Sequence, residues 1–141
     1  METELYFTLF LAVLNLDTGG LQAVQAGHPP AVILGIDDEV QILGDGGMPI
    51  GLIDVAQFET MTYRLTSGDR LLLLSDGLSE CENAAGTMLE AEGVAEMAVS
   101  QNKHCAADLP KIILDQVIEY AGKSNFDDDV SMLALDFGRE S

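Results

Sequence analysis

The sequence contains no tryptophan, two cysteines and only six lysine and arginine residues among 141. Cys81 and Cys105 are too few for a disulfide framework and lack the spacing of a metal-binding cluster, so we expect reduced thiols. The longest apolar runs, such as residues 71–74, fall far short of the roughly 20 residues that span a bilayer. The sequence therefore argues against a disulfide-stapled scaffold and against membrane insertion of this segment.

The scarcity of positive charge contrasts with 24 acidic residues and leaves a formal net charge of −18. Such a charge opposes binding to nucleic acid and to anionic membranes. The sequence starts without the basic region of a signal peptide and carries no lipidation motif, so we expect a cytoplasmic location. The acidity serves either solubility or the binding of divalent cations, and the second role requires carboxylates at specific positions.

Apolar, β-favouring segments separated by turn residues make up the first half of the chain. They predict two hairpins, a glycine-rich loop and two further strands: residues 6–16 with 21–26, 31–36 with 39–43, the loop at 44–54, and strands at 57–65 and 70–75. The segment 70–75 is apolar on both faces, which predicts a central strand with layers packed on both sides of its sheet.

Helical periodicity appears in the second half, at residues 91–102 and 106–121, and a last strand is expected at 130–137. Pro110 lies in the first turn of the second helix, and Gly122 stands where a left-handed C-cap is expected. Strands, two helices and a final strand predict an α+β layered domain. An apolar strand so close to Met1, without edge-protecting charges, suggests a larger domain of which this is a part; a natural N-terminal edge strand is the alternative.

Two acidic sites adjoin buried strands. Asp76 follows the strand at 70–75, and Asp127, Asp128 and Asp129 precede the last strand. If these strands are antiparallel neighbours, the carboxylates lie at the same edge of the sheet, where like charges repel unless a cation intervenes. The alternative reading is a common Asp-Gly turn and a solvated acidic loop.

Seven motifs occur in order along the chain: YFTLF at 6–10, DTG at 17–19, AGHPP at 26–30, GMPIG at 47–51, SGDR at 67–70, SDGLSE at 75–80 and DDVS at 128–131. This series resembles the C-terminal part of the catalytic domain of the SpoIIE/RsbU phosphatases, a bacterial branch of the type 2C (PPM) serine/threonine phosphatases. The resemblance implies an α-β-β-α layered sandwich with mainly antiparallel sheets. Residues 1–141 would be a partial domain that contains two C-terminal helices and lacks the N-terminal part.

The resemblance also implies two Mn²⁺ or Mg²⁺ ions, with Asp76 and Asp128 as metal ligands. Asp127 or Asp129 could take the place of Asp128, because adjacent aspartates are not separated by sequence. Glu80 matches a recurrent glutamate of the family and is expected to support the site rather than bind metal.

The family implies hydrolysis of a phosphorylated protein in bacterial signalling, with an anti-sigma-factor antagonist as substrate and an upstream sensory or receiver domain as regulator. The family reaction also needs acidic residues from the first half of the domain, so we expect this chain alone to be inactive. The alternative is a catalytically silent sensor or adaptor that binds a protein partner.

His28, Arg70 and His104 are polar residues outside the two acidic sites. His28 lies in a loop-forming Gly-His-Pro-Pro segment and receives no catalytic role. Arg70 opens a buried strand, which favours an ion pair with a nearby carboxylate over phosphate binding. His104 is interpreted, with Cys105, as part of the turn before a helix.

Overall fold

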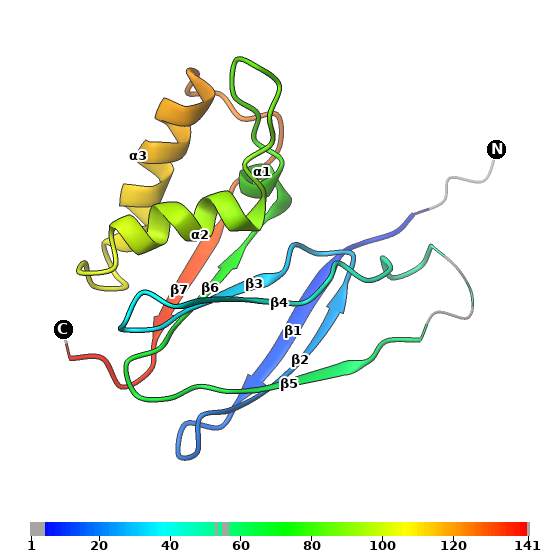
Figure 1. Cartoon of the computed structure of the whole chain (residues 1–141). Coiled ribbons are helices and arrows are strands. Elements are labelled where there is room, and N and C mark those ends of the chain that lie inside the picture. Colours follow the sequence, from blue (N-terminus) through cyan, green and yellow to red (C-terminus); the bar gives the residue numbers. More distant parts are fainter. Residues whose placement is uncertain (1–4, 53, 55–56, 141) are drawn as a thin grey trace.

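The computed structural model describes residues 5–52, 54 and 57–140, which form two antiparallel sheets and three helices (Figure 1). One sheet has the strand order β1-β2-β5 and the other the order β4-β3-β6-β7. The strands are β1 (Leu9–Leu14), β2 (Gly20–Ala26), β3 (Ala31–Leu34), β4 (Val40–Leu43), β5 (Thr60–Arg64), β6 (Arg70–Leu74) and β7 (Met132–Asp136). The helices are α1 (Asp76–Ser79), α2 (Glu90–Ser100) and α3 (Leu109–Ala121).

The four-stranded sheet lies between the helices and the other sheet. Side chains alternate across a strand, so Leu72 and Leu74 of β6 pack in a cluster with residues of α2 and α3. Leu71 of the same strand packs in a second cluster with residues of the three-stranded sheet, such as Leu21. This arrangement explains why β6 is apolar on both faces and confirms its predicted central place in the sheet.

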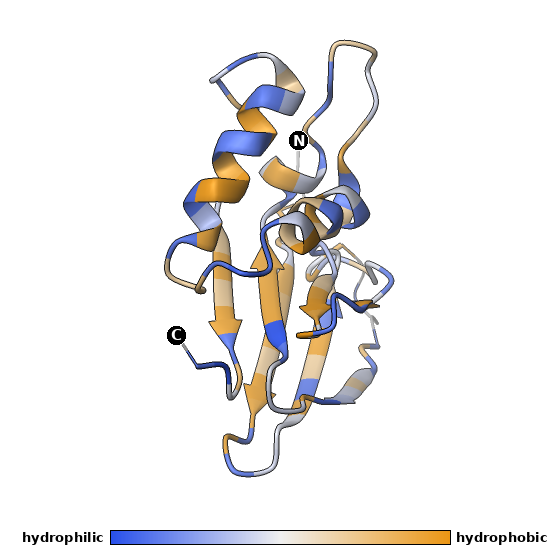
Figure 2. Cartoon of the chain, turned by 60° about the vertical axis from the view of Figure 1, so that its left-hand side comes forward, coloured by the Kyte–Doolittle hydropathy of each residue, from blue (hydrophilic) through white to orange (hydrophobic). Residues whose placement is uncertain are grey.

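The amphipathic helices α2 and α3 supply the third layer. Leu109, Ile113 and Val117 of α3 are fully buried, and Figure 2 shows hydrophobic and hydrophilic residues alternating along the helical turns. Pro110 lies in the first turn and Gly122 adopts a left-handed conformation with φ 67° at the C-cap, both as predicted.

The predicted hairpins and helices are confirmed, although most elements are shorter than expected. Helix α3 begins at Leu109 rather than at residue 106, because residues 106–108 form a turn. Helix α1 was not predicted, since a single turn of helix shows no periodicity. Residue 53 of the predicted loop at 44–54 lies outside the described residues.

The outward-facing residues of β1, an edge strand of the three-stranded sheet, are apolar and exposed. Leu9, Leu11 and Val13 are 37%, 56% and 66% exposed. Within the described part of the chain, α2 and α3 cover only the four-stranded sheet (Figure 1). The observed order of layers is therefore helices, sheet, sheet. None of the described helices combines the length and apolar character needed to cross a membrane.

Candidate functional site

The candidate site lies where β6 ends and β7 begins. The two strands are antiparallel neighbours, with Leu74 opposite Met132, so the condition under which the acidic segments would meet is fulfilled. Asp76 follows β6 and Asp128 precedes β7, so both residues lie at the same end of this strand pair. The buried strands thereby bring the two acidic segments to one edge of the sheet.

Ser75 ties the two segments together. Its backbone amide donates to Ser131 O at 3.0 Å. The Ser131 amide in turn donates to Ser75 Oγ at 2.8 Å. The Ser75 hydroxyl donates to Asp129 O at 3.1 Å. Three hydrogen bonds therefore hold the acidic loop against the residue that precedes Asp76.

Gly77 permits a close backbone approach at the same place. A β-carbon at Gly77 would overlap the carbonyl oxygen of Asp129 and lie 3.1 Å from the carbonyl oxygen of Asp128. The opposing atoms belong to the backbone, so they cannot turn aside as a flexible side chain can. The absence of a side chain at residue 77 therefore sets how closely the Asp76 turn and the acidic loop can approach.

Replacing Gly77 with alanine is expected to destabilise the protein by about 1–3 kcal/mol, because the added methyl group forces the acidic loop away. Urea unfolding followed by circular dichroism measures this change. Gly93→Ala is the matched control, since a β-carbon there would meet the end of the flexible Leu89 side chain at 2.6 Å. Alanine also favours the helix that contains Gly93. Equal losses in the two variants would contradict the proposed backbone contact.

Asp127 and Asp128 of the acidic loop have different surroundings. The Asp127 side chain is 96% exposed and lies 3.4 Å from Lys123 Nζ. Asp128 Oδ1 accepts a hydrogen bond from the Asp129 amide at 2.8 Å. Asp127 is therefore already paired with a cation, whereas Asp128 lies beside the backbone segment that Gly77 contacts.

Two neighbouring grooves surround the candidate carboxylates. Asp76 lines a groove of about 430 Å³ together with His28 and Asp45. Asp128 lines a groove of about 240 Å³. Glu80 lines both grooves, so it borders the groove of each aspartate. Across residues 5–52, 54 and 57–140, no three histidine, cysteine, aspartate or glutamate side chains are grouped closely enough to hold a metal ion.

Cys81 adjoins the groove of Asp128 but is a free, buried thiol. Burial raises the pKa of this thiol, the charges of Asp127 and Glu82 act in the same direction, and Lys123 opposes them. Cys81 therefore stays protonated near neutral pH and acts as part of the core beneath the site.

Gln25 positions the wall of the Asp76 groove, and the sequence did not single it out. It is a polar residue buried in β2, 6% exposed. Its Nε2 donates to His28 O at 2.6 Å, and its Oε1 accepts from the Gly46 amide at 3.0 Å. β2 contains two glutamines, Gln22 and Gln25, and nothing in the sequence marked Gln25 as the buried one. His28 itself lies in a loop, as predicted.

Residues 1–138 match the protein family described as Stage II sporulation protein E (SpoIIE). The chain is 23% identical to Protein IcfG of Synechocystis over 134 residues, which is 95% of this chain. It is 24% identical to the Phosphoserine phosphatase RsbU of Bacillus subtilis over 120 residues, which is 84% of this chain.

The phosphatase domain of SpoIIE from Bacillus subtilis, solved after presoaking with manganese, has the same fold with a TM-score of 0.76 at 17% identity. The match covers 95% of this chain and 58% of that structure. The chain spans 21% of IcfG and 36% of RsbU. It therefore corresponds to a part of each of these longer proteins.

Proposed function

The chain belongs to the SpoIIE family, and on that premise we propose that it is the C-terminal portion of a metal-dependent phosphatase domain that hydrolyses phosphoserine or phosphothreonine in a signalling protein. The observation that carries the proposal is the junction of β6 and β7, where Ser75 and Gly77 hold the Asp76 turn against the loop of Asp128.

The residues at this junction suit a hard divalent cation such as Mn²⁺ or Mg²⁺. Asp76 and Asp128 offer carboxylate oxygens, which are the ligands these ions prefer. The backbone contact at Gly77 holds the two acidic segments close without a side chain between them. We therefore propose Asp76 and Asp128 as the ligands that this portion contributes.

In the mechanism that we propose, the protein positions the groups that offset charge on the phosphoryl group, and no covalent bond forms between enzyme and phosphate. Bound divalent ions would supply an activated water and offset the charge that develops on the phosphoryl oxygens. Asp76 and Asp128 would hold the cations at the end of the β6–β7 pair. Glu80 would orient the two aspartate side chains from the wall shared by the two grooves. The groove of Asp76 would admit the phosphorylated side chain, with the His28 loop as one of its walls.

We further propose that residues 1–141 lack a layer and some carboxylates that the rest of the domain supplies. The apolar face of β1 is support for this, because exposed Leu9, Leu11 and Val13 form a surface suited to a covering helix layer. The greater length of the relatives leaves room for such a segment. Carboxylates from that segment would complete a centre for two metal ions.

Comparison of the 141-residue chain with a protein extended upstream tests the proposed function. With Mn²⁺ and an aryl phosphate, we expect turnover by the 141-residue chain to be lower by tenfold or more, because the extended protein adds the remaining ligands. Strong Mn²⁺-dependent turnover by the 141-residue chain would overturn the partial-domain proposal. A folded extended protein without turnover would instead favour the silent sensor or adaptor.

The substrate that we propose is a phosphorylated anti-sigma-factor antagonist, with an upstream sensory or receiver domain controlling the reaction in the cytoplasm. The likeness to RsbU, which is named a phosphoserine phosphatase, supports this proposal. The net charge of −18 would repel an acidic phosphoprotein at long range. Local contacts near the metal ions would have to overcome that repulsion.

A further inference from the structure

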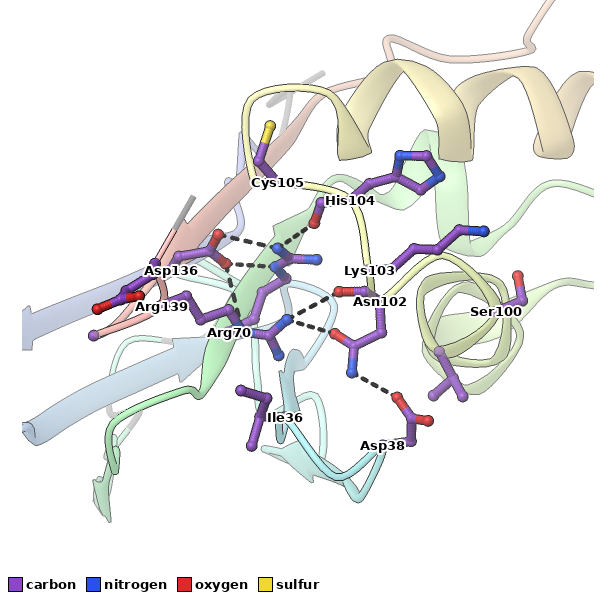
Figure 3. Close-up of a pocket in the computed structure, with 13 residues that line it drawn as sticks. Ile36, Asp38, Arg70, Ser100, Asn102, Lys103, His104, Cys105, Asp136 and Arg139 are labelled. Carbon is purple, nitrogen blue, oxygen red and sulfur yellow. Dashed lines mark hydrogen bonds and ion pairs between the residues drawn. The ribbon is translucent and has the colours of Figure 1, made fainter.

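A further cavity of about 840 Å³ lies at the opposite end of the β6–β7 pair from Asp76 and Asp128. Figure 3 shows the residues that line it. The turn after β3, the connection between α2 and α3, and the residues after β7 enclose it. We call it the arginine cavity; its polar walls include Arg70, Asn102, Lys103, His104, Asp136 and Arg139. Its volume is in the range of small-molecule sites.

The arginine cavity concentrates the few positive charges of the chain. Arg70, Lys103 and Arg139 are three of the six lysine and arginine residues in the sequence. They gather at one place in a chain whose net charge is −18. Solubility does not require such clustering, so the cavity needs a separate explanation.

Arg70 is 1% exposed and has one donor group to spare. Its Nε and Nη2 donate to the Asp136 carboxylate at 2.5 and 3.0 Å. Nη2 also donates to His104 O at 2.6 Å. Nη1 is buried and has no partner within the described residues. Buried donors are rarely left unpaired, so this nitrogen points to an acceptor that the protein itself does not provide.

Arg139 adds a second guanidinium group to the same wall. Its Nε donates to Gly68 O at 2.5 Å, its Nη1 to Asn102 O at 3.1 Å and Asn102 Oδ1 at 2.7 Å, and its Nη2 to Leu34 O at 3.1 Å. All three nitrogens of Arg139 therefore have acceptors within the protein, and the group contributes charge rather than a free donor. Its Nε lies 3.9 Å from Asp136. Two guanidinium groups therefore share one carboxylate, as Figure 3 shows. The pKa of Arg139 lies below its ordinary value, because burial and the charge of Arg70 lower it. The charges of Asp136, Asp69 and Asp38 oppose this change only in part.

The edges of the arginine cavity carry charges of both signs. Asp38 accepts a hydrogen bond from Asn102 Nδ2 at 2.6 Å, so one of its oxygens is already used. Glu140 is exposed at the edge. Lys103 is exposed too and forms no ion pair with the part of the chain that is described. Lys103 is therefore available to an anion that enters between the arginines and the edge.

We propose that the arginine cavity binds a small molecule through a carboxylate or phosphate group. The two arginines provide a fixed positive wall, and Lys103 closes over the bound anion. Arg70 Nη1 is the one guanidinium nitrogen of this wall without an acceptor in the described part of the chain, so it would donate to one oxygen of the ligand, while Arg139 contributes its charge. A charge-assisted bond of this kind suits a carboxylate and a phosphate alike. The site is separate from the candidate metal centre, since the two lie at opposite ends of the β6–β7 pair.

Calorimetric titration of the protein with sodium phosphate and, separately, with sodium succinate tests this proposal. EDTA is present and sodium chloride keeps the ionic strength constant. We expect saturable binding of at least one of the two anions, and the tighter one identifies the class of ligand. Asp76→Asn should leave the dissociation constant unchanged, because the metal centre is at the other end of the strands.

Lys103→Ala is expected to weaken the binding by about tenfold, since it removes one ion-pair partner of the ligand. Lys111→Ala is the matched control, because Lys111 is an exposed lysine of α3 that pairs with Asp115 and does not line the cavity. Absence of saturable binding for both anions would overturn the proposal. Equal weakening by the two lysine variants would also overturn it, since it would indicate general charge screening.

Discussion

Replacement of Asp76 by asparagine in the protein extended upstream is expected to lower kcat/KM for an aryl phosphate by about 1000-fold while leaving the fold intact. A neutral amide is a much poorer ligand for a hard cation than a carboxylate. Loss of the metal would remove several kcal/mol of transition-state stabilisation, and each 1.36 kcal/mol corresponds to tenfold in rate. Initial rates with an aryl phosphate in saturating Mn²⁺ measure the effect. Circular dichroism confirms that the variant is folded.

Controls within the acidic loop make this expectation more specific. Asp128→Asn should resemble Asp76→Asn, because Asp128 lies at the backbone contact with Gly77. Asp127→Asn should keep activity within about twofold of the parent, since its side chain is 96% exposed and paired with Lys123. Retention of most activity by Asp76→Asn would remove this residue from the site. A large loss only in Asp127→Asn would move the second ligand to Asp127.

Features that depend on short stretches of sequence were predicted well. The apolar run of β6 predicted a strand covered on both faces, and the structure places it between two clusters of the core. The Gly122 cap follows from one local rule about left-handed residues. The antiparallel pairing of β6 with β7, which the sequence offered only as the condition for bringing the acidic segments together, is present in the structure.

Features that depend on distant contacts could not be predicted. An ion pair was expected for Arg70, but its partner Asp136 is 66 residues away and no periodicity connects them. The contact of Gly77 with Asp129 depends on tertiary packing of two loops. The arginine cavity is built from several separate segments of the chain. Such contacts form only when the layers pack together, so the order of residues along the chain does not predict them.

Replacement of Asp136 by asparagine is expected to lower the free energy of unfolding by about 3 kcal/mol. Removing one partner of a buried pair costs about 3–5 kcal/mol, and the lower end applies because the Asp136 side chain is 19% exposed. The variant leaves Arg70 charged and buried without its carboxylate. Urea unfolding of the 141-residue chain measures the loss.

The double replacement Arg70→Met with Asp136→Leu is the control for this effect. It removes both charges and fills the space with apolar side chains, so we expect it to be less destabilising than Asp136→Asn alone. A single variant as stable as the parent protein would show that Asp136 does not hold Arg70 in place. A double variant that is much less stable than Asp136→Asn would show that packing, rather than the unpaired charge, sets the cost.

The urea midpoint of the parent protein should also fall more steeply on acidification than the urea midpoint of Asp136→Asn. Burial alone would raise the pKa of Asp136, but hydrogen bonds and charge from Arg70, the Ala106 amide and the charge of Arg139 outweigh it and hold the pKa below 3.8. A carboxyl whose pKa is lower in the folded state stabilises the fold above its unfolded pKa. This contribution disappears as the pH falls from about 4 through the lower folded value. Urea midpoints measured at intervals from pH 6 to pH 3 should therefore converge for the two proteins, and parallel curves would exclude Asp136 as the titrating group.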